Sequence, residues 1–386
     1  MCKKVLTIFF ILICFVFSVF AQTEILTNEE IILICLTSLL GQSARVPVYS
    51  ESSPDKTEAK TNPPQLKIES NKENLDEDVI HVETDLVIIP AQITERNGKI
   101  VSGLKKEEFK IFENGIEQEI AYFSNEEQPF TVALVLDMSY SSVFKLPEIQ
   151  NAALAFVNQL RENDKVMVVS FDEKVRVLCE PTNNRKVLQL AIEGAKIASG
   201  TSLYSALDLV FNEKFNRLAG RKAVVLLSDG VDTSSQKLTA GDVLKEAVAT
   251  DVVVHPIQYD TWDDVQKTRK NSAQIYYDDN DRPYSVEAPR IKGEREEDYK
   301  AANNFFKEIS NQTGGGLYRV SSTTNLNQAF AKIADELRKI YSLGYYPSSE
   351  RNVGVRYATK VRVYRPNLLI RAKNGYIWQP KRNLSY

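Results

Sequence analysis

The sequence is poor in the residues that most often carry catalysis and soft-metal binding. Its 386 residues include only two histidines and four cysteines, and no two cysteines have the CxxC spacing. A His-rich zinc site, a zinc ribbon and a thioredoxin-like redox centre are therefore excluded. Lys and Arg total 48 against 51 Asp and Glu, and no long basic run exists, so nucleic-acid binding through bulk charge is not expected.

What the chain does have is enough apolar sequence for a sizeable core. It is 43% hydrophobic and 26% charged, which is typical of globular proteins. At the usual length of about 100–200 residues for a domain, the chain has room for two or three domains.

The N-terminus has the pattern of a secretory signal. Lys3 and Lys4 precede the almost wholly apolar residues 5–20, and the small Ala21 follows. We expect export, with cleavage after Ala21, to the cell envelope, the periplasm or the outside. The alternative is an uncleaved anchor, because residues 5–21 reach the lower edge of a membrane span. A membrane is an expected partner only in that case.

Two blocks of strand-like sequence lie far apart in the chain. Residues 82–123 and 341–378 alternate short apolar runs with turn signals such as Asn114-Gly115 and Asn374-Gly375. Each block has too few strands for a stable sheet. Together they supply about seven strands, which suits a small antiparallel β-sandwich.

The region between the two blocks predicts an α/β fold. Val-rich runs, as expected of strands covered on both faces, alternate with amphipathic helical patterns, so we expect a doubly wound, mostly parallel sheet with helices on both faces. Residues 175–179 follow a strand across only three residues and should form an antiparallel edge strand. The expected parallel strands are 132–136, 166–171, 223–227, 252–257 and 317–320.

These patterns divide the chain into five segments, with the α/β domain inserted into the sandwich. The polar residues 50–78 form a flexible tether after a short helix. The predicted segments are a signal peptide (1–21), a helix and disordered tether (22–78), the first half of the β-sandwich (79–128), the α/β domain (129–340, with an insert at 259–300) and the second half of the sandwich (341–386).

Small oxygen-bearing side chains follow the predicted strands at one edge of the sheet. Asp137, Ser139 and Ser141 follow the first strand, Thr201 precedes a helix, and Asp229 follows the 223–227 strand. Because binding sites of open α/β sheets lie beyond the carboxyl ends of the strands, these residues should converge. Hard oxygen ligands without histidine or cysteine suit Mg²⁺, or Mn²⁺.

The spacing Asp137-x-Ser139-x-Ser141, with Thr201 and Asp229, resembles the metal-ion-dependent adhesion site (MIDAS) of von Willebrand factor A (VWFA) domains. That resemblance covers roughly residues 130–340. The flanks, which include VIIPAQITERNGK and YSLGYYPSSERN, resemble the ends of the acidobacterial-type VWFA-related bacterial proteins. The resemblance implies a fold and a metal site, but no established reaction.

The predicted function is Mg²⁺-dependent binding of a protein or surface ligand. The three hydroxyls should bind the ion directly or through water, and the two aspartates should supply negative charge. So few direct carboxylates leave the ion partly positive, and an open coordination position then attracts an Asp or Glu of a partner protein.

Other functions are weaker interpretations. A serine nucleophile needs a base, and neither His81 nor His255 lies in the loop at Asp137; His255 is expected to be a packed strand residue. We therefore expect no enzyme. The alternatives are an envelope scaffold whose metal site is vestigial and, less favoured, a metal-dependent hydrolase.

Several acidic residues are assigned no metal. Asp172, Glu193 and Asp208 are expected on the solvated surface, and Asp232 should shape its loop. The insert 259–300 leaves the same sheet edge as the metal loops and could influence partner choice. Its aspartates fail the EF-hand spacing, so we expect a flexible charged loop there.

Overall fold

The structure is a computed structural model that describes residues 86–126, 128–140 and 146–379. The predicted signal peptide and tether, together residues 1–78, lie outside these ranges, and so does Ser141. The described residues belong to one compact unit.

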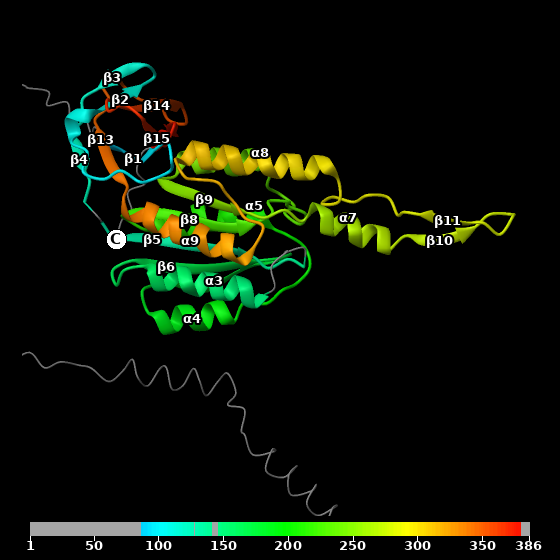
Figure 1. The fold of residues 1–386 in the computed structure, drawn as a ribbon. Coiled ribbons are helices and arrows are strands. Elements are labelled where there is room, and N and C mark those ends of the chain that lie inside the picture. The colour runs from blue at the N-terminus through cyan, green and yellow to red at the C-terminus, as the bar shows by residue number, and fades with distance from the viewer. Residues whose placement is uncertain (1–85, 127, 141–145, 380–386) are drawn as a thin grey trace, which may run out of the picture. The chain divides into compact units, whose positions relative to one another are not determined.

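A six-stranded sheet lies at the centre of this unit (Figure 1), in the order β12-β9-β8-β5-β6-β7. Neighbours from β12 to β6 run parallel, and β7 is antiparallel to β6 because the three residues between them cannot form a crossover. The predicted edge strand is confirmed. The strands are β5 (Phe130–Asp137), β6 (Lys165–Phe171), β7 (Val175–Thr182), β8 (Arg221–Ser228), β9 (Val252–Gln258) and β12 (Tyr318–Arg319).

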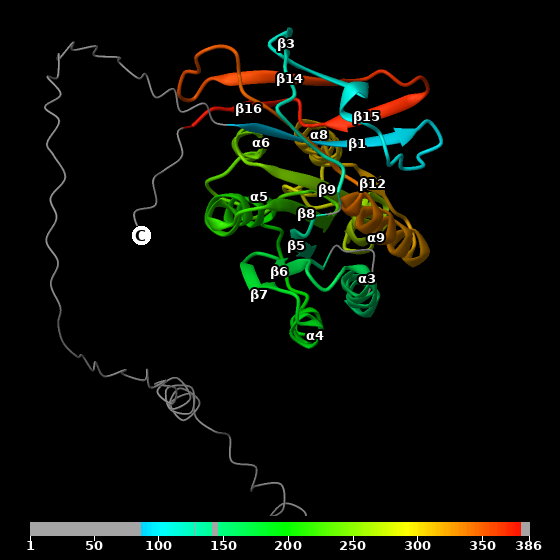
Figure 2. The same cartoon turned by 90° about the vertical axis from the view of Figure 1, so that its left-hand side faces the viewer.

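Helices cover both faces of this sheet (Figure 2). Alternate residues of β5 explain why: Leu134 packs in one cluster with Phe156 and Phe330, whereas Val135 packs in the other with Phe306. The predicted mostly parallel α/β fold is confirmed. One face carries α3 (Leu146–Gln159), α4 (Arg185–Glu193) and α9 (Thr323–Arg338), and the other α5 (Leu203–Asp208), α6 (Ala240–Ala249) and α8 (Glu296–Thr313).

Two antiparallel four-stranded sheets combine strands from before and after the α/β region. In one sheet β1 pairs with β13 and β15, and in the other β2 pairs with β14. The strands are β1 (Val87–Glu95), β2 (Phe109–Glu113), β3 (Ile116–Gln118), β4 (Tyr122–Ser124), β13 (Tyr341–Tyr345), β14 (Arg356–Val363), β15 (Leu368–Ala372) and β16 (Gly375–Ile377). The sheets agree with the predicted sandwich strands, and the exact segment boundaries stay predictions.

The core of these antiparallel sheets is separate from the two cores of the α/β region. Ile93, Ile111 and Leu343 are fully buried in it. The hairpin between β2 and β3 turns at Asn114 and Gly115, whose φ angles are 48° and 87°. Both angles are positive, as the Asn-Gly signal of a type I′ turn predicts.

Charged side chains join the antiparallel sheets to the α/β region. Arg371 of β15 places its Nη2 2.7 Å from Oε2 of Glu336 on α9, and Lys373 donates from Nζ to the carbonyl of Thr250 at 2.5 Å. Glu336 and Lys373 are both buried. The joint is therefore held by paired charges as well as by apolar contact.

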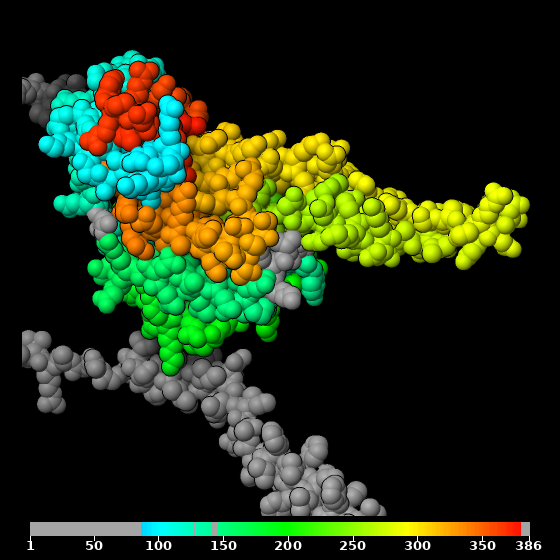
Figure 3. All heavy atoms as spheres, in the orientation of Figure 1, coloured from blue at the N-terminus to red at the C-terminus, as the bar shows by residue number. Residues whose placement is uncertain are grey.

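The insert 259–300 corrects one prediction. Instead of a flexible loop it forms α7 (Trp262–Asn271) and a hairpin of β10 (Gln274–Tyr277) and β11 (Pro283–Val286), which protrudes from the body (Figures 1 and 3). Acidic residues lie in the first turn of α7 and basic residues in its last, which favours a helix. Asp278 Oδ1 accepts from Asn280 N and Arg282 N, at 2.9 and 2.8 Å, and so closes the hairpin turn.

Among the described residues, no helix has both the length and the apolar character needed to cross a membrane.

Candidate metal centre

Three loops meet at the carboxyl edge of the sheet. The loop after β5 pairs with the segment before α5: Tyr140 N donates to Ala198 O (3.1 Å) and Ala198 N to Met138 O (2.9 Å). The loop after β8 joins that segment in turn, because Thr233 N donates to Thr201 O at 2.9 Å. Backbone hydrogen bonds thus bring together segments that are about 60 and 30 residues apart in sequence.

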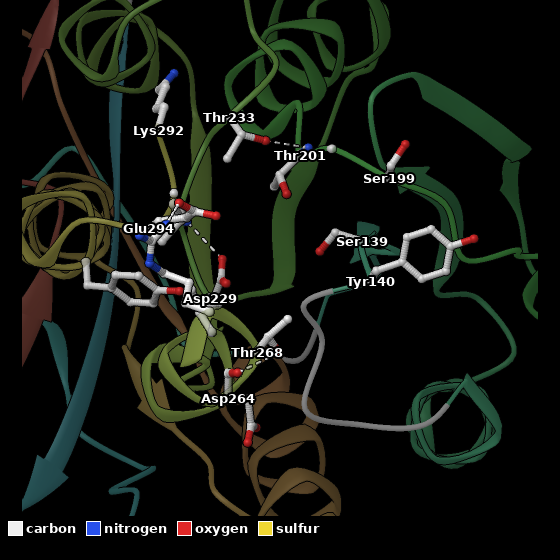
Figure 4. A pocket seen from close by; sticks show the side chains of 16 residues that line it. Ser139, Tyr140, Ser199, Thr201, Asp229, Thr233, Asp264, Thr268, Lys292 and Glu294 are labelled. Atoms are coloured by element: carbon white, nitrogen blue, oxygen red, sulfur yellow. Dashed lines mark hydrogen bonds and ion pairs between the residues drawn. The ribbon is translucent and has the colours of Figure 1, made fainter. Parts of the chain in front are cut away.

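The predicted metal residues converge as far as they are described. Ser139, Thr201 and Asp229 line one cavity of about 580 Å³, and Figure 4 shows their side chains around it. Asp137 is fully buried and hydrogen-bonded to Ser139, which lines the cavity. The fifth predicted ligand, Ser141, lies outside the described residues.

Asp137 is fixed by neutral donors. Its Oδ1 accepts from Ser139 N at 3.0 Å, and its Oδ2 accepts from Ser228 Oγ at 2.6 Å. Burial raises the pKa of this carboxyl, and the hydrogen bonds from Ser228, Ser139 and Tyr259 oppose that shift. No described cation forms an ion pair with it.

Asp229 is the second buried carboxylate, with 3% of its surface exposed. Its Oδ1 accepts from Val231 N at 2.9 Å, and its Oδ2 accepts from Thr261 Oγ1 at 2.7 Å. Burial, and then the negative charge of Asp137, raise the pKa of Asp229 to about 7. The two carboxylates therefore repel each other across the site.

Thr201 presents its hydroxyl to the cavity. Its backbone N–H lies 3.0 Å from Thr233 Oγ1, and its carbonyl accepts from Thr233 and Ser234. Within the described chain the Thr201 hydroxyl makes no hydrogen bond, and Figure 4 shows it among the cavity-lining groups. Gly200 allows this approach: its φ is +79°, and a Cβ there would lie 2.6 Å from Ser234 Oγ.

The cations around the cavity have other partners. Lys292 Nζ lies 3.4 Å from Asp232, and Arg269 pairs with Glu294 and, at 3.7 Å, with Glu287. Neither is within ion-pair distance of Asp137 or Asp229 in the described structure. The two buried carboxylates lack a compensating charge from the residues described, and this arrangement fits a bound cation.

The described residues that line the cavity include no histidine or cysteine, the usual ligands of soft metals. Within the described ranges, no group of three or more His, Cys, Asp or Glu side chains has metal-binding geometry. A cation at this edge would depend on two carboxylates and several hydroxyls, which suits a hard ion such as Mg²⁺. His255 is buried in β9, where its Nδ1 accepts from Gly316 N at 3.2 Å, as expected of a packed strand residue.

Two acidic residues that were not predicted to bind metal have clear structural contacts. Asp232 accepts from Tyr204 N and Ser235 N, both at 3.0 Å, so it shapes its loop as predicted. The prediction for Asp172 is wrong: it is 1% exposed, and Arg176 on the adjacent antiparallel strand pairs with it.

Sequence reasoning missed the residues that position the two aspartates. Ser228 was visible as the last residue of a strand, next to Asp229. Thr261 and Tyr299 come from the insert; their hydroxyl oxygens lie 2.9 Å apart, and Thr261 holds Asp229. No local pattern marks these two, because their role depends on how the insert folds back onto the sheet edge.

The sequence of the α/β region is similar to that of a known domain family. Residues 132–231 match the von Willebrand factor type A domain family. An uncharacterized protein from Synechocystis sp. is 31% identical over 106 residues, which are 26% of this chain and 25% of that protein. The chain thus matches only a quarter of the length of this relative.

Several solved structures are similar at low identity. A von Willebrand factor type A protein from Catenulispora acidiphila has 10% identity and a TM-score of 0.41, covering 78% of this chain and 76% of that one. An aerotolerance-related membrane protein from Bacteroides fragilis has 16% identity and a TM-score of 0.38, covering 54% and 98%. The vWF domain of the type V pili tip protein Mfa5 from Porphyromonas gingivalis has 15% identity and a TM-score of 0.37, covering 54% and 94%.

The family match spans β5 to β8, the two strands whose carboxyl ends carry Asp137 and Asp229. Together with the mostly parallel sheet covered by helices on both faces, this match shows that the α/β region has a fold like that of von Willebrand factor type A domains.

Proposed function

We propose that this protein binds a partner protein through a Mg²⁺ ion at the carboxyl edge of its central sheet. Ser139, Ser141 and Thr201 would hold the ion through hydroxyl oxygens, directly or through water. Asp137 and Asp229 would supply negative charge. Mn²⁺ has the same preference for oxygen ligands and would substitute.

The observation that carries the proposal is the uncompensated pair of buried carboxylates. Asp137 is fully buried and Asp229 is 3% exposed, yet each is held only by hydroxyl and backbone N–H donors. Burying one unpaired carboxylate is unfavourable, and burying two together is more so. A divalent cation would offset both charges at once.

The same donor set supports a partner carboxylate. Mg²⁺ prefers six oxygen ligands and tends to keep waters when the protein supplies few. With two carboxylates and neutral hydroxyls, the ion stays partly positive toward the cavity. An Asp or Glu of another protein would complete its coordination better than a neutral group would.

A binding role fits this site better than catalysis. His255, the one histidine within the described residues, is in the strand core and does not line the cavity. The serine and threonine hydroxyls therefore have no imidazole base next to them. The signal-like N-terminus supports export. We therefore propose that the protein is an adhesion-type binding protein that acts outside the cytoplasm.

The metal is tested by thermal unfolding of the full chain with Mg²⁺ and with EDTA. At a hundredfold excess over Kd, a ligand specific for the folded state adds about 2.7 kcal/mol of stability. Wild type should melt higher with Mg²⁺, whereas Asp137→Ala and Thr201→Ala should lose most of this shift.

Asp172→Asn is the matched control. Asp172 is also buried, in the loop after β6, but it is paired with Arg176. This variant should keep the wild-type Mg²⁺ shift whatever its own melting temperature. Equal Mg²⁺ shifts in wild type and Asp137→Ala would refute the site.

The partner is tested by affinity capture from an envelope extract. A partner retained in Mg²⁺ should be released by EDTA and restored by Mg²⁺ or Mn²⁺. Changing one acidic residue of that partner to Ala should abolish binding. Retention in EDTA by wild type, or by Asp137→Ala, would contradict metal-mediated binding even if the ion itself binds.

A further inference from the structure

A second cavity lies at the opposite edge of the central sheet from the metal centre. It has a volume of about 360 Å³ and sits where β5, β8 and β9 begin, between these strands and the antiparallel strands β1, β4 and β13. This volume is within the roughly 300–1,000 Å³ range of small-molecule sites. None of its lining residues belongs to the metal cavity.

Most of the wall is apolar. Phe130, Val253, Leu337 and Ile340 line it and are between 2% and 8% exposed. Ile88 of β1 also lines it but is 45% exposed, which places this side chain toward solvent. The α/β region and the antiparallel sheets therefore both contribute apolar side chains that a small apolar ligand could contact.

One guanidinium in this wall, that of Arg221, forms no ion pair within the described residues. Arg221 donates from Nη1 to Gln128 O at 3.2 Å and from Nη2 to Leu337 O at 2.7 Å. These two bonds leave three of its five N–H donors for other acceptors. Across the described ranges no carboxylate lies within ion-pair distance of Arg221. Burial lowers its pKa, and the more distant negative charge of Asp164 opposes that shift.

The other charged residues that line the cavity form no ion pair with Arg221. Lys222 also lines the cavity, and its Nζ donates to the carbonyls of Phe215 and Leu218. Asp251, the one acidic residue in the lining, lies 3.5 Å from Lys373 and is exposed to solvent. The lining therefore carries an excess of positive charge beside an apolar surface.

We propose that this cavity is a binding site for an amphipathic monoanion, with a single carboxylate on Arg221 and an apolar body against Phe130, Val253 and Ile340. A guanidinium with free donors binds a carboxylate through charge-assisted hydrogen bonds. The apolar body gains from leaving water, since most of the wall is hydrophobic. This site is independent of the metal centre.

The test is an isothermal calorimetric titration of the full chain, in EDTA, with decanoate and separately with decanol. Decanoate should bind at one site, and decanol, which has the same chain but no charge, should bind at least about tenfold more weakly. Arg221→Gln should abolish this preference for the anion.

Arg185→Gln is the matched control. Arg185 also donates to backbone carbonyls, those of Val157, Leu160 and Arg161, but it does not line the cavity. This variant should bind decanoate as wild type does. A loss of affinity equal to that of Arg221→Gln would indicate a general charge effect and overturn the proposal.

A pair of variants at the exposed Ile88 keeps the test decisive if Arg221→Gln fails to fold. Ile88→Glu places a negative charge at the cavity and should weaken decanoate binding, whereas Ile88→Lys should not. No saturable decanoate binding by folded wild type, or equal affinity for decanol, would refute the site. So would unchanged decanoate affinity in both folded Arg221→Gln and Ile88→Glu.

Discussion

Two regions of the molecule bury carboxylates in opposite ways. At the joint between β15 and the α/β region, Glu336 meets Arg371 at 2.7 Å. At the carboxyl edge of the sheet, Asp137 and Asp229 are also buried, but the charges that act on Asp229 are the negative ones of Asp137 and Asp260. A buried carboxylate that has a cationic partner can hold two parts of the fold together. A buried pair of carboxylates without one is instead suited to binding a cation from solution.

The largest expected effect is at the joint. Arg371→Met should destabilise the protein by about 3 kcal/mol, because it leaves Glu336 buried without its partner. Urea unfolding measures this change. Arg356→Met, an exposed arginine on β14, is the control and should stay within about 0.5 kcal/mol of wild type.

Removing both partners should recover part of the loss. In Arg371→Met with Glu336→Leu, no unpaired charge remains in the joint. If Arg371→Met alone costs no more than its control, the joint is not held by this ion pair, and the contrast between the two regions disappears.

The next effect is a dependence of stability on pH. Burial chiefly lowers the pKa of His255 from 6.5 to about 4; Glu336 opposes the shift and Arg371 supports it. As pH falls from 6.5 to 4, the unfolded chain takes up a proton that the folded chain does not. Stability should therefore fall across this window, by at most about 3 kcal/mol, and His255 contributes no such loss above pH 6.5.

His255→Gln isolates this contribution. Glutamine can still accept from Gly316 N but does not titrate, so the variant should lose less stability between pH 6.5 and 4 than wild type. Denaturant unfolding at several pH values gives both slopes. Identical slopes would show that burial does not keep His255 neutral in the folded protein.

The smallest expected effect has the opposite sign to the first. In EDTA, Asp229→Asn should stabilise the folded protein by about 1 kcal/mol, because it removes one of two like charges and keeps an acceptor for Val231 N. Asp172→Asn should instead destabilise it, since Arg176 loses its partner. Urea unfolding without metal measures both; destabilisation by Asp229→Asn would mean that this carboxylate is compensated after all.

Much of the fold was predictable because it is encoded by local patterns. The strands of the central sheet carry continuous apolar runs that are buried on both faces, and Asn114-Gly115 needs positive φ angles. The convergence of Asp137 and Asp229 at one edge of the sheet was predictable for a related reason. Each lies at the carboxyl end of a parallel strand, where the binding sites of such sheets form.

What the sequence could not show depends on contacts between distant segments. Asp172 was expected at the surface, but it is buried where the segment before α5 meets it, with Ser202 N donating to its carbonyl at 2.8 Å. Thr261 reaches Asp229 only after the insert folds back onto the sheet. The charge of that insert suggested flexibility, yet the same charges are at the helix ends and in the hairpin turn, where they stabilise local structure.

The pairing of β1 has a consequence for the order in which the chain can fold during synthesis. Both partners of β1, β13 and β15, are made some 250 residues later. The central sheet can assemble as its own strands emerge, but β1 keeps two unpaired edges until the C-terminal strands leave the ribosome. Such edges are prone to pair with other chains, so the nascent protein needs protection during this interval.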